Sequence, residues 1–308
     1  MNSKLAIYIV KRLALAVVTV FLVIAITFFS MHSIPGGPFL SEKSPSAAVT
    51  KALEEKFGLD KPKGEQFVTY LKGVVKFDFG PSIKQRGREV STVIMQGFKV
   101  SAKLGGSAAV IALTMGLILG SFAAVFHNSI VDKFIMVVST ALVAMPSFIA
   151  ATFLLLIFCV NMKILPANGN EPGGLILPII ALSLSPMSYI IRLTRSSMLD
   201  VLGQDYIRTA RAKGVKPSKV LFKHALRNAV TPVVTYAGPM IAFIVTGSLV
   251  VEKIFAVPGL GKEFISSIVN RDYTMIMGTT IFLATILVIM MLISDIMYKV
   301  FDPRIDLS

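Results

Sequence analysis

Long apolar stretches that hold no charged side chain alternate with charged segments along the whole chain. A helix needs about 20 apolar residues to cross the hydrocarbon core of a bilayer, because it rises about 1.5 Å per residue and the core is about 30 Å thick. Six stretches are long enough, so the pattern predicts an all-α polytopic membrane protein with six transmembrane helices. The predicted spans are residues 13–31, 104–126, 134–162, 172–191, 228–251 and 273–298.

The distribution of Lys and Arg around these spans predicts how the chain is oriented in the membrane. With the N-terminus inside the cell, the inside segments carry many more cations than the short outside loops. This orientation predicts a cytoplasmic N-terminus at 1–12, an extracytoplasmic segment at 32–103, a cytoplasmic loop at 192–227 and a cytoplasmic tail at 299–308. The first span follows a basic start, as in a signal peptide, but its apolar run is too long for one, so we expect an uncleaved anchor.

The composition agrees with a membrane protein and argues against other classes. Hydrophobic residues make up 54% of the chain and charged residues 16%, whereas a soluble globular protein has about 25% charged residues. The net charge of +14 could indicate nucleic-acid binding, but basic cytoplasmic loops explain it without a soluble basic surface, and we expect no nucleic-acid partner. The single cysteine, Cys159, lies in an apolar run and is expected to act as a small apolar side chain.

The extracytoplasmic segment at 32–103 mixes charged and apolar residues. It opens with a cluster of helix breakers at 34–38, and two stretches then read as short helices, 47–57, closed by Gly58, and 66–77. Two interpretations stay open for this segment: a packed cap over the outer mouth, or a docking surface for an external partner.

The cytoplasmic loop at 192–227 carries nine cations against two acidic residues. Leu199, Leu202, Tyr206 and Ala210 recur at helical spacing, which predicts one apolar stripe. Gly214 is typical of a helix end, and Pro217 of a helix start. The pattern therefore predicts two short helices with a glycine corner, and it favours docking to another protein over an ordinary solvated loop.

Residues with catalytic or metal-binding chemistry form no recognisable group in the sequence. No segment matches G-x-x-x-x-G-K-[ST], the phosphate-binding loop of many ATPases. His32, His127 and His224 lie in separate segments without metal-ligand spacing. We therefore expect a non-catalytic chain without a cofactor or a metal site.

The predicted spans hold no ionisable residue near their centres, which disfavours a proton-coupled carrier. Sodium coupling through carbonyl and hydroxyl groups stays open. If the chain moves a solute uphill, we expect the energy to come from a partner that attaches at the cytoplasmic loop.

Two segments of that loop resemble a known signature. Residues 205–214, DYIRTARAKG, and residues 224–229, HALRNA, are similar to the cytoplasmic loop of bacterial ABC importer permeases, most closely the oligopeptide/dipeptide (and nickel) branch. In the wider family the loop reads Glu-Ala-Ala, whereas this chain has Arg208, Thr209 and Ala210, so the glutamate is absent. Further similar segments, in the same order, are 34–36, 79–82, 145–148, 164–166, 192–195, 251–255, 257–261, 270–273 and 302–304.

The resemblance implies a type I ABC importer permease fold, in the bacterial cell membrane, with this chain as the first permease of a heterodimer. It implies a sister permease, two cytoplasmic ATPases that use ATP and Mg, and an extracytoplasmic solute-binding protein that delivers peptide. It also implies the residues that couple the permease to the ATPases. These are Asp205, Tyr206, Arg208, Thr209, Ala210, Arg211, Lys213 and Gly214.

Other functions remain open at this point. The same architecture could import nickel or another small solute, because selectivity would lie largely with the binding protein. An ion-coupled secondary transporter is a different class and predicts uptake without ATPases. A membrane enzyme is disfavoured because no catalytic group is visible. Ser183, Ser185 and Ser188 offer hydroxyls to a solute, but serines in spans more often bond their own backbone or a neighbouring helix.

Overall fold

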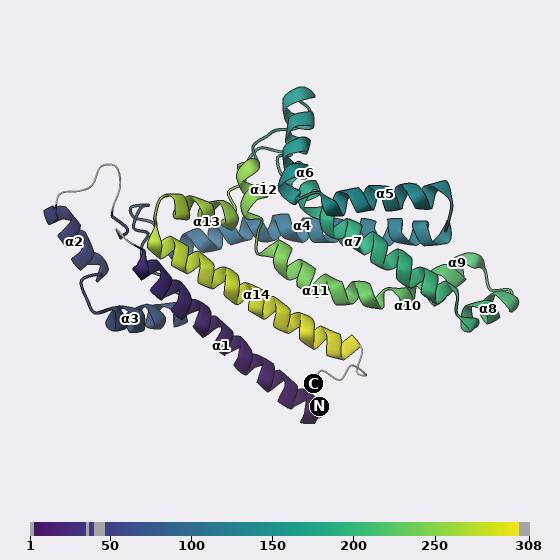
Figure 1. The fold of residues 1–308 in the computed structure, drawn as a ribbon, viewed down its shortest axis with the longest axis horizontal. Helices are drawn as coiled ribbons and strands as arrows, with labels where there is room; N and C mark the ends of the chain where they lie inside the picture. Colours follow the sequence, from purple (N-terminus) through teal and green to yellow (C-terminus); the bar gives the residue numbers. More distant parts are fainter. Residues whose placement is uncertain (1–2, 35–36, 40–46, 302–308) are drawn as a thin grey trace. The chain divides into compact units, whose positions relative to one another are not determined.

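The computed structural model describes residues 3–34, 37–39 and 47–301, and within these ranges the chain is helical, with one isolated β-bridge between Pro81 and Glu89. The breaker residues 35 and 36, the 302–304 motif and most of the predicted tail at 299–308 lie outside the described residues. Figure 1 shows the helices in chain order. The α-helices are α1 Ser3–Ser33, α2 Ala47–Phe57, α3 Lys63–Val75, α4 Val90–Val125, α5 Ile130–Ala144, α6 Ser147–Leu154, α7 Ile176–Leu202, α8 Asp205–Ala212, α9 Pro217–Lys219, α10 Arg227–Ala229, α11 Thr231–Val245, α12 Leu249–Ile254, α13 Leu260–Val269 and α14 Tyr273–Phe301. Two π-helical segments, Leu155–Asn161 and Val220–Leu226, continue α6 and α9.

Five stretches of helix are long and apolar enough to span a membrane, and a bent pair brings the number to six within the described residues. The bent pair is α5 with α6 and its π-helical continuation, and it turns by 106°. The sequence predicts one span over 134–162, but Pro146 divides it. Because a residue before proline avoids the helical conformation, Met145 is extended (φ −85°, ψ 118°) and α5 ends there.

The other predicted spans differ from the helices mainly at their ends. Helix α4 begins at Val90 rather than 104, because a helix continues through lysines that a charge-free criterion excludes. Helix α7 begins at Ile176 rather than 172, after Gly173 in the left-handed conformation (φ +83°). The predicted span at 228–251 is interrupted before α12 by Gly247 (φ +97°).

The two short helices expected between the first two spans are confirmed. Helix α2 covers the predicted 47–57, and Gly58 follows it with φ +65°. Helix α3 begins at Lys63, three residues before the predicted start at 66, because Pro62 at its N-cap fixes the backbone angle φ there. It ends before Phe77, which adopts φ +58°.

The chain forms two compact units, residues 1–100 with 258–292 and residues 101–257 with 293–308. The first unit holds an apolar core from α1, α4, α13 and α14. Asp272, which is buried, joins the 80–89 hairpin to the start of α14: it accepts hydrogen bonds from the Ser82 hydroxyl and from the backbone N–H groups of Ile83 (3.2 Å) and Met275 (3.3 Å).

In the second unit, glycines bring α4 close to α7. A Cβ at Gly116 would lie 2.6 Å from Ile190 Cγ2, and one at Gly120 would lie 2.6 Å from the Ile191 carbonyl oxygen. The spacing Gly116-x-x-x-Gly120 puts both on one face of the helix, as in close contacts between membrane helices. The α4–α7 contact therefore requires the absence of side chains at these positions.

Gly120→Val is expected to lower the free energy of unfolding by about 1–3 kcal/mol, because the added carbons overlap the backbone of α7. The matched control is Gly106→Val in the same helix, where an added Cβ has no atom within 4 Å. Thermal unfolding of both variants in one detergent checks this, and equal melting temperatures would contradict the close contact.

Candidate functional site

The predicted coupling residues lie on α8 and on the corner that follows it. Helix α7 ends at Leu202, the chain turns at Gly203 and Gln204, and α8 begins at Asp205. Gly214 adopts φ +72°, and Pro217 opens α9 as its first residue. The predicted pair of short helices with a glycine corner is confirmed.

The apolar stripe of this loop differs from the expected one. Tyr206 is 43% exposed, whereas its neighbour Ile207 is fully buried. The cause is the turn at Gly203, which interrupts the helix between Leu202 and Asp205. The residues that face the core after the turn therefore do not continue the spacing of those before it.

Ile207 anchors α8 to a local core in the second unit. This core contains Met198 of α7, Ala124 of α4, and Val220, Ala225 and Ala229 of the segment after the corner. Ala210 packs against it and is only partly exposed, so its small side chain serves packing within the chain rather than an open surface. The other seven predicted coupling residues are exposed.

The exposed side of α8 carries most of its charge. Arg208 lies 3.7 Å from Asp205 in an exposed i,i+3 pair, which contributes little stability. Asn228 donates a hydrogen bond to the Tyr206 hydroxyl (3.0 Å), which ties α8 to the helix that returns to α11. The arrangement therefore holds α8 in place and leaves its cations exposed.

An apolar hollow of about 460 Å³ lies beside the corner. Phe222 in its wall is 65% exposed. The wall consists of Val125, Leu202, Arg211, Val215, Pro217, Ser218, Val220, Leu221 and Phe222.

A buried ion pair near this loop is not evident from sequence patterns. Arg195 of α7 binds Asp132 of α5 through two hydrogen bonds of 2.6 and 2.8 Å. His127 lies 3.4 Å from the same carboxylate, and the backbone N–H of Asn128 donates to it (2.9 Å). In the sequence, the only indications of this pair are Asp132, an isolated acidic residue just before a predicted span, and Arg195 in the similar segment 192–195.

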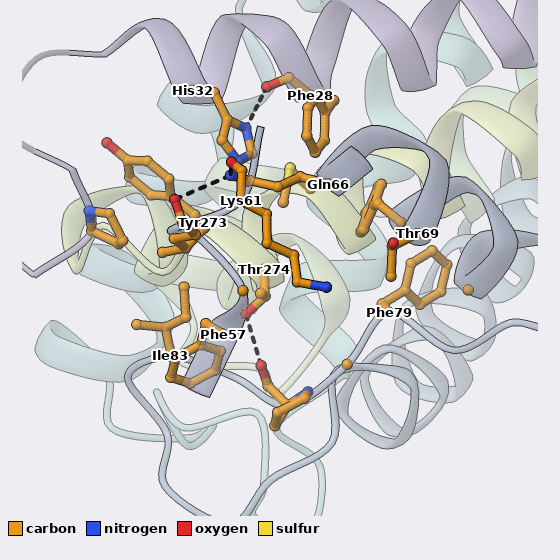
Figure 2. Close-up of a pocket in the computed structure, with 18 of the residues that line it drawn as sticks. Phe28, His32, Phe57, Lys61, Gln66, Thr69, Phe79, Ile83, Tyr273 and Thr274 are labelled. Carbon is orange, nitrogen blue, oxygen red and sulfur yellow. Dashed lines mark hydrogen bonds between the residues drawn. The ribbon is translucent and has the colours of Figure 1, made fainter. Parts of the chain in front are cut away.

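The first unit contains a separate pocket of about 360 Å³ between α1, α2, α3, the 78–83 segment and α14 (Figure 2). Phe28, Phe57 and Phe79 make its walls largely apolar. The hydroxyls of Tyr70 and Tyr273 are buried and have no hydrogen-bond partner within the described residues. Burial raises the pKa of Tyr70, so its hydroxyl stays neutral. Lys61 at the pocket bonds Glu65 (2.8 Å), which raises the pKa of the lysine.

Neither the loop nor the pocket offers a metal site. Within the described ranges, no three His, Cys, Asp or Glu side chains come together in a group that could hold a metal ion. The loop offers an anchored backbone, exposed cations and an apolar hollow.

Comparison with known families identifies the chain. Residues 116–307 match the family described as binding-protein-dependent transport system inner membrane component, and residues 5–99 match the corresponding N-terminal family. The chain belongs to this family. As an inner membrane component it is a multi-pass protein of the cell membrane, and the match includes the whole of α7, the loop and α11.

Related inner membrane components match over nearly the full length of the chain. The dipeptide transport system permease protein DppB of Bacillus subtilis is 48% identical over 97% of this chain and 98% of the relative. The oligopeptide transport system permease protein OppB of Haemophilus influenzae is 40% identical over the same shares.

Solved structures show the fold. The MetNI methionine ABC transporter gives a TM-score of 0.53 at 16% identity, over 68% of this chain and 95% of the other. An amino acid ABC transporter gives 0.52 at 17% identity, over 70% and 95%. The chain thus has the type I importer permease fold that the sequence predicted.

Proposed function

We propose that this chain is a transmembrane permease subunit of an ATP-driven ABC importer for dipeptides or oligopeptides. The observation that carries the proposal is the full-length similarity to permeases named for dipeptide and oligopeptide transport. The chain itself is a non-catalytic subunit. A sister permease completes the pathway, and a solute-binding protein delivers the peptide from outside.

In this proposal both termini and the loop between α7 and α11 face the cytoplasm. Two ATPase subunits bind ATP and Mg and receive α8 with the corner at Gly214. Their closure moves the loop, and the core around Ile207 passes the movement to α7, because a packed core transmits displacement instead of absorbing it. The exposed cations and the hollow with Phe222 are the surfaces that the ATPases would contact.

Co-purification tests the proposed function. The tagged chain is extracted from its native membrane in mild detergent, and the proteins that accompany it are identified by mass spectrometry. Recovery of ATPases and a second permease is the expected result. Recovery of the chain alone, still supporting uptake after ATP depletion, would favour an ion-coupled carrier and overturn the proposal. Any binding protein recovered is then tested for peptide against nickel.

Replacing Arg208 and Arg211 by Glu is expected to weaken association with the ATPases by about tenfold or more, which corresponds to about 1.4 kcal/mol. The reason is that two exposed cations on one helix become anions that repel the acidic groups they would meet. Pull-down of ATPase subunits at physiological salt measures the effect. The matched control replaces Lys11 and Lys133, which are exposed and lie outside the loop, by Glu. Equal loss in both variants would indicate a general charge effect and not a contact of α8.

A further inference from the structure

One face of α7 differs from the rest of the helix. Tyr189 and Ser196 are exposed, and Ser185 and Arg192, each one turn earlier along the helix, are partly exposed. These four residues are spaced by four, three and four positions, so they form one stripe along the helix. We call them the polar stripe of α7. The opposite side, with Ile190, Ile191 and Thr194, is buried in the second unit.

Other open helix faces of the same unit are apolar. Helix α4 exposes Ile118 and Phe122, and α5 exposes Phe134 and Val137. Two hydroxyls on these helices bond their own backbone: Thr114 donates to the Val110 carbonyl (2.7 Å) and Thr140 to the Met136 carbonyl (2.8 Å). Such surfaces suit contact with lipid, because they are apolar and these hydroxyls are satisfied within their own helices.

The hydroxyls of the polar stripe are not satisfied in this way. The buried Ser183 and Ser188 donate to carbonyls of α7 itself (2.8 and 2.7 Å), as expected for serines in spans. In the part of the chain that the structure describes, the hydroxyls of Ser185 and Ser196 make no hydrogen bond, and Arg192 has no acidic partner. Arg192 directly follows the predicted span at 172–191, and an arginine near the end of a span extends its charged group to water or polar groups rather than to lipid tails, so this part of the stripe is better suited to a polar environment.

A second helix contributes an aromatic side chain to this face. The ring of Tyr236, on α11, lies 4.3 Å from that of Tyr189, centroid to centroid, at an angle of 34°. Tyrosines combine a flat apolar surface with a hydroxyl. The pair can therefore contact the side chains of a peptide and bond its backbone, whatever its sequence.

We propose that the polar stripe of α7, with Tyr236, lines the aqueous passage of the peptide between this chain and its sister permease. Arg192 attracts a peptide carboxylate, and the tyrosine pair contacts the peptide chain. The inference rests on the proposed function and extends it to named residues. The inference also connects the peptide passage with the ATPases, since the chain leads from α7 through the turn at Gly203 and Gln204 directly into α8.

Thiol labelling tests this inference in the assembled transporter. Cys159 is first replaced by Ser, which removes the single native thiol of this chain, and labelling is read on this chain alone. Ser185→Cys and Tyr189→Cys are then compared with Ile118→Cys and Val137→Cys on the apolar faces. The probe is a charged methanethiosulfonate, which reacts with the thiolate. A thiol in apolar surroundings has a raised pKa and reacts slowly, so we expect the stripe variants to react about tenfold faster or more.

Protection distinguishes a solute passage from a water-exposed surface. With binding protein and peptide present during ATP turnover, labelling at the stripe is expected to slow, while labelling of an exposed thiol at Ile130→Cys, at the start of α5 and outside the proposed ATPase surface, is unchanged. Stripe thiols that react no faster than the controls, in a transporter that still imports peptide, would overturn the inference. Fast labelling without protection would overturn the contact with peptide and favour a lipid headgroup at Arg192. Absence of ATP-dependent peptide uptake by the transporter with the native chain would instead overturn the proposed function.

Discussion

Gly214→Trp is expected to leave the protein folded in the membrane and to abolish ATP-dependent uptake. Gly214 has φ +72°, and an added Cβ there has no atom within 4 Å. The indole would therefore project into open space, in the direction from which the proposed ATPase approaches. Strain at a left-handed position costs about 1–2 kcal/mol for a residue with a Cβ, which a folded protein usually tolerates. Uptake of labelled peptide into vesicles, with membrane insertion checked by blotting, measures the effect.

A matched variant separates strain from obstruction. Asn tolerates the left-handed conformation better than other residues with a Cβ, so Gly214→Asn should retain most of the uptake. Wild-type uptake by Gly214→Trp would remove the corner from the coupling surface. Equal loss in both variants would assign the effect to the backbone and not to the docked partner.

The corner also illustrates what sequence patterns can predict. The positions of Gly214 and Pro217 defined two short helices, because each residue has a specific backbone preference that acts locally. The buried face of α8 was misassigned, since a turn at Gly203 and Gln204 shifts the helical phase. Nothing in the hydrophobic period distinguishes that turn from a continued helix.

The spans show the same division between local and tertiary information. Their number follows from hydrophobic length, which the bilayer sets directly. The bend at Met145 and Pro146 is also local in origin, and the proline could have signalled it. By contrast, the packing of Gly116 and Gly120 against α7, and the burial of Glu252 with its bond to Ser101 (2.7 Å), depend on segments far away in the chain.

Asp132→Ala is expected to lower the free energy of unfolding by about 3 kcal/mol or more, because it leaves the partner of a buried ion pair without its counter-charge. The side chain of Asp132 is 3% exposed and that of Arg195 is 21% exposed, so solvent compensates little. The carboxylate also accepts a hydrogen bond from Asn128, which has φ +63° in the turn between α4 and α5. Removal of Asp132 thus loosens both the turn and the contact of α5 with α7. Thermal unfolding in detergent measures the change.

A double variant tests whether charge or packing is responsible. If the loss comes from an unpaired charge, Asp132→Leu combined with Arg195→Met should recover most of the stability, since apolar pairs of similar volume often replace buried ion pairs at little cost. If the hydrogen bond to Asn128 dominates, the double variant should be as unstable as Asp132→Ala, because both lack the acceptor. If Asp132→Ala has the same melting temperature as the wild type, the ion pair contributes nothing to stability. If the double variant recovers its stability, its uptake of peptide can be measured separately from folding. Arg195 lies one turn from Arg192 on the helix that leads into α8. Loss of uptake in a stable double variant would therefore show that the ion pair is needed for movement of α7 rather than for its folding.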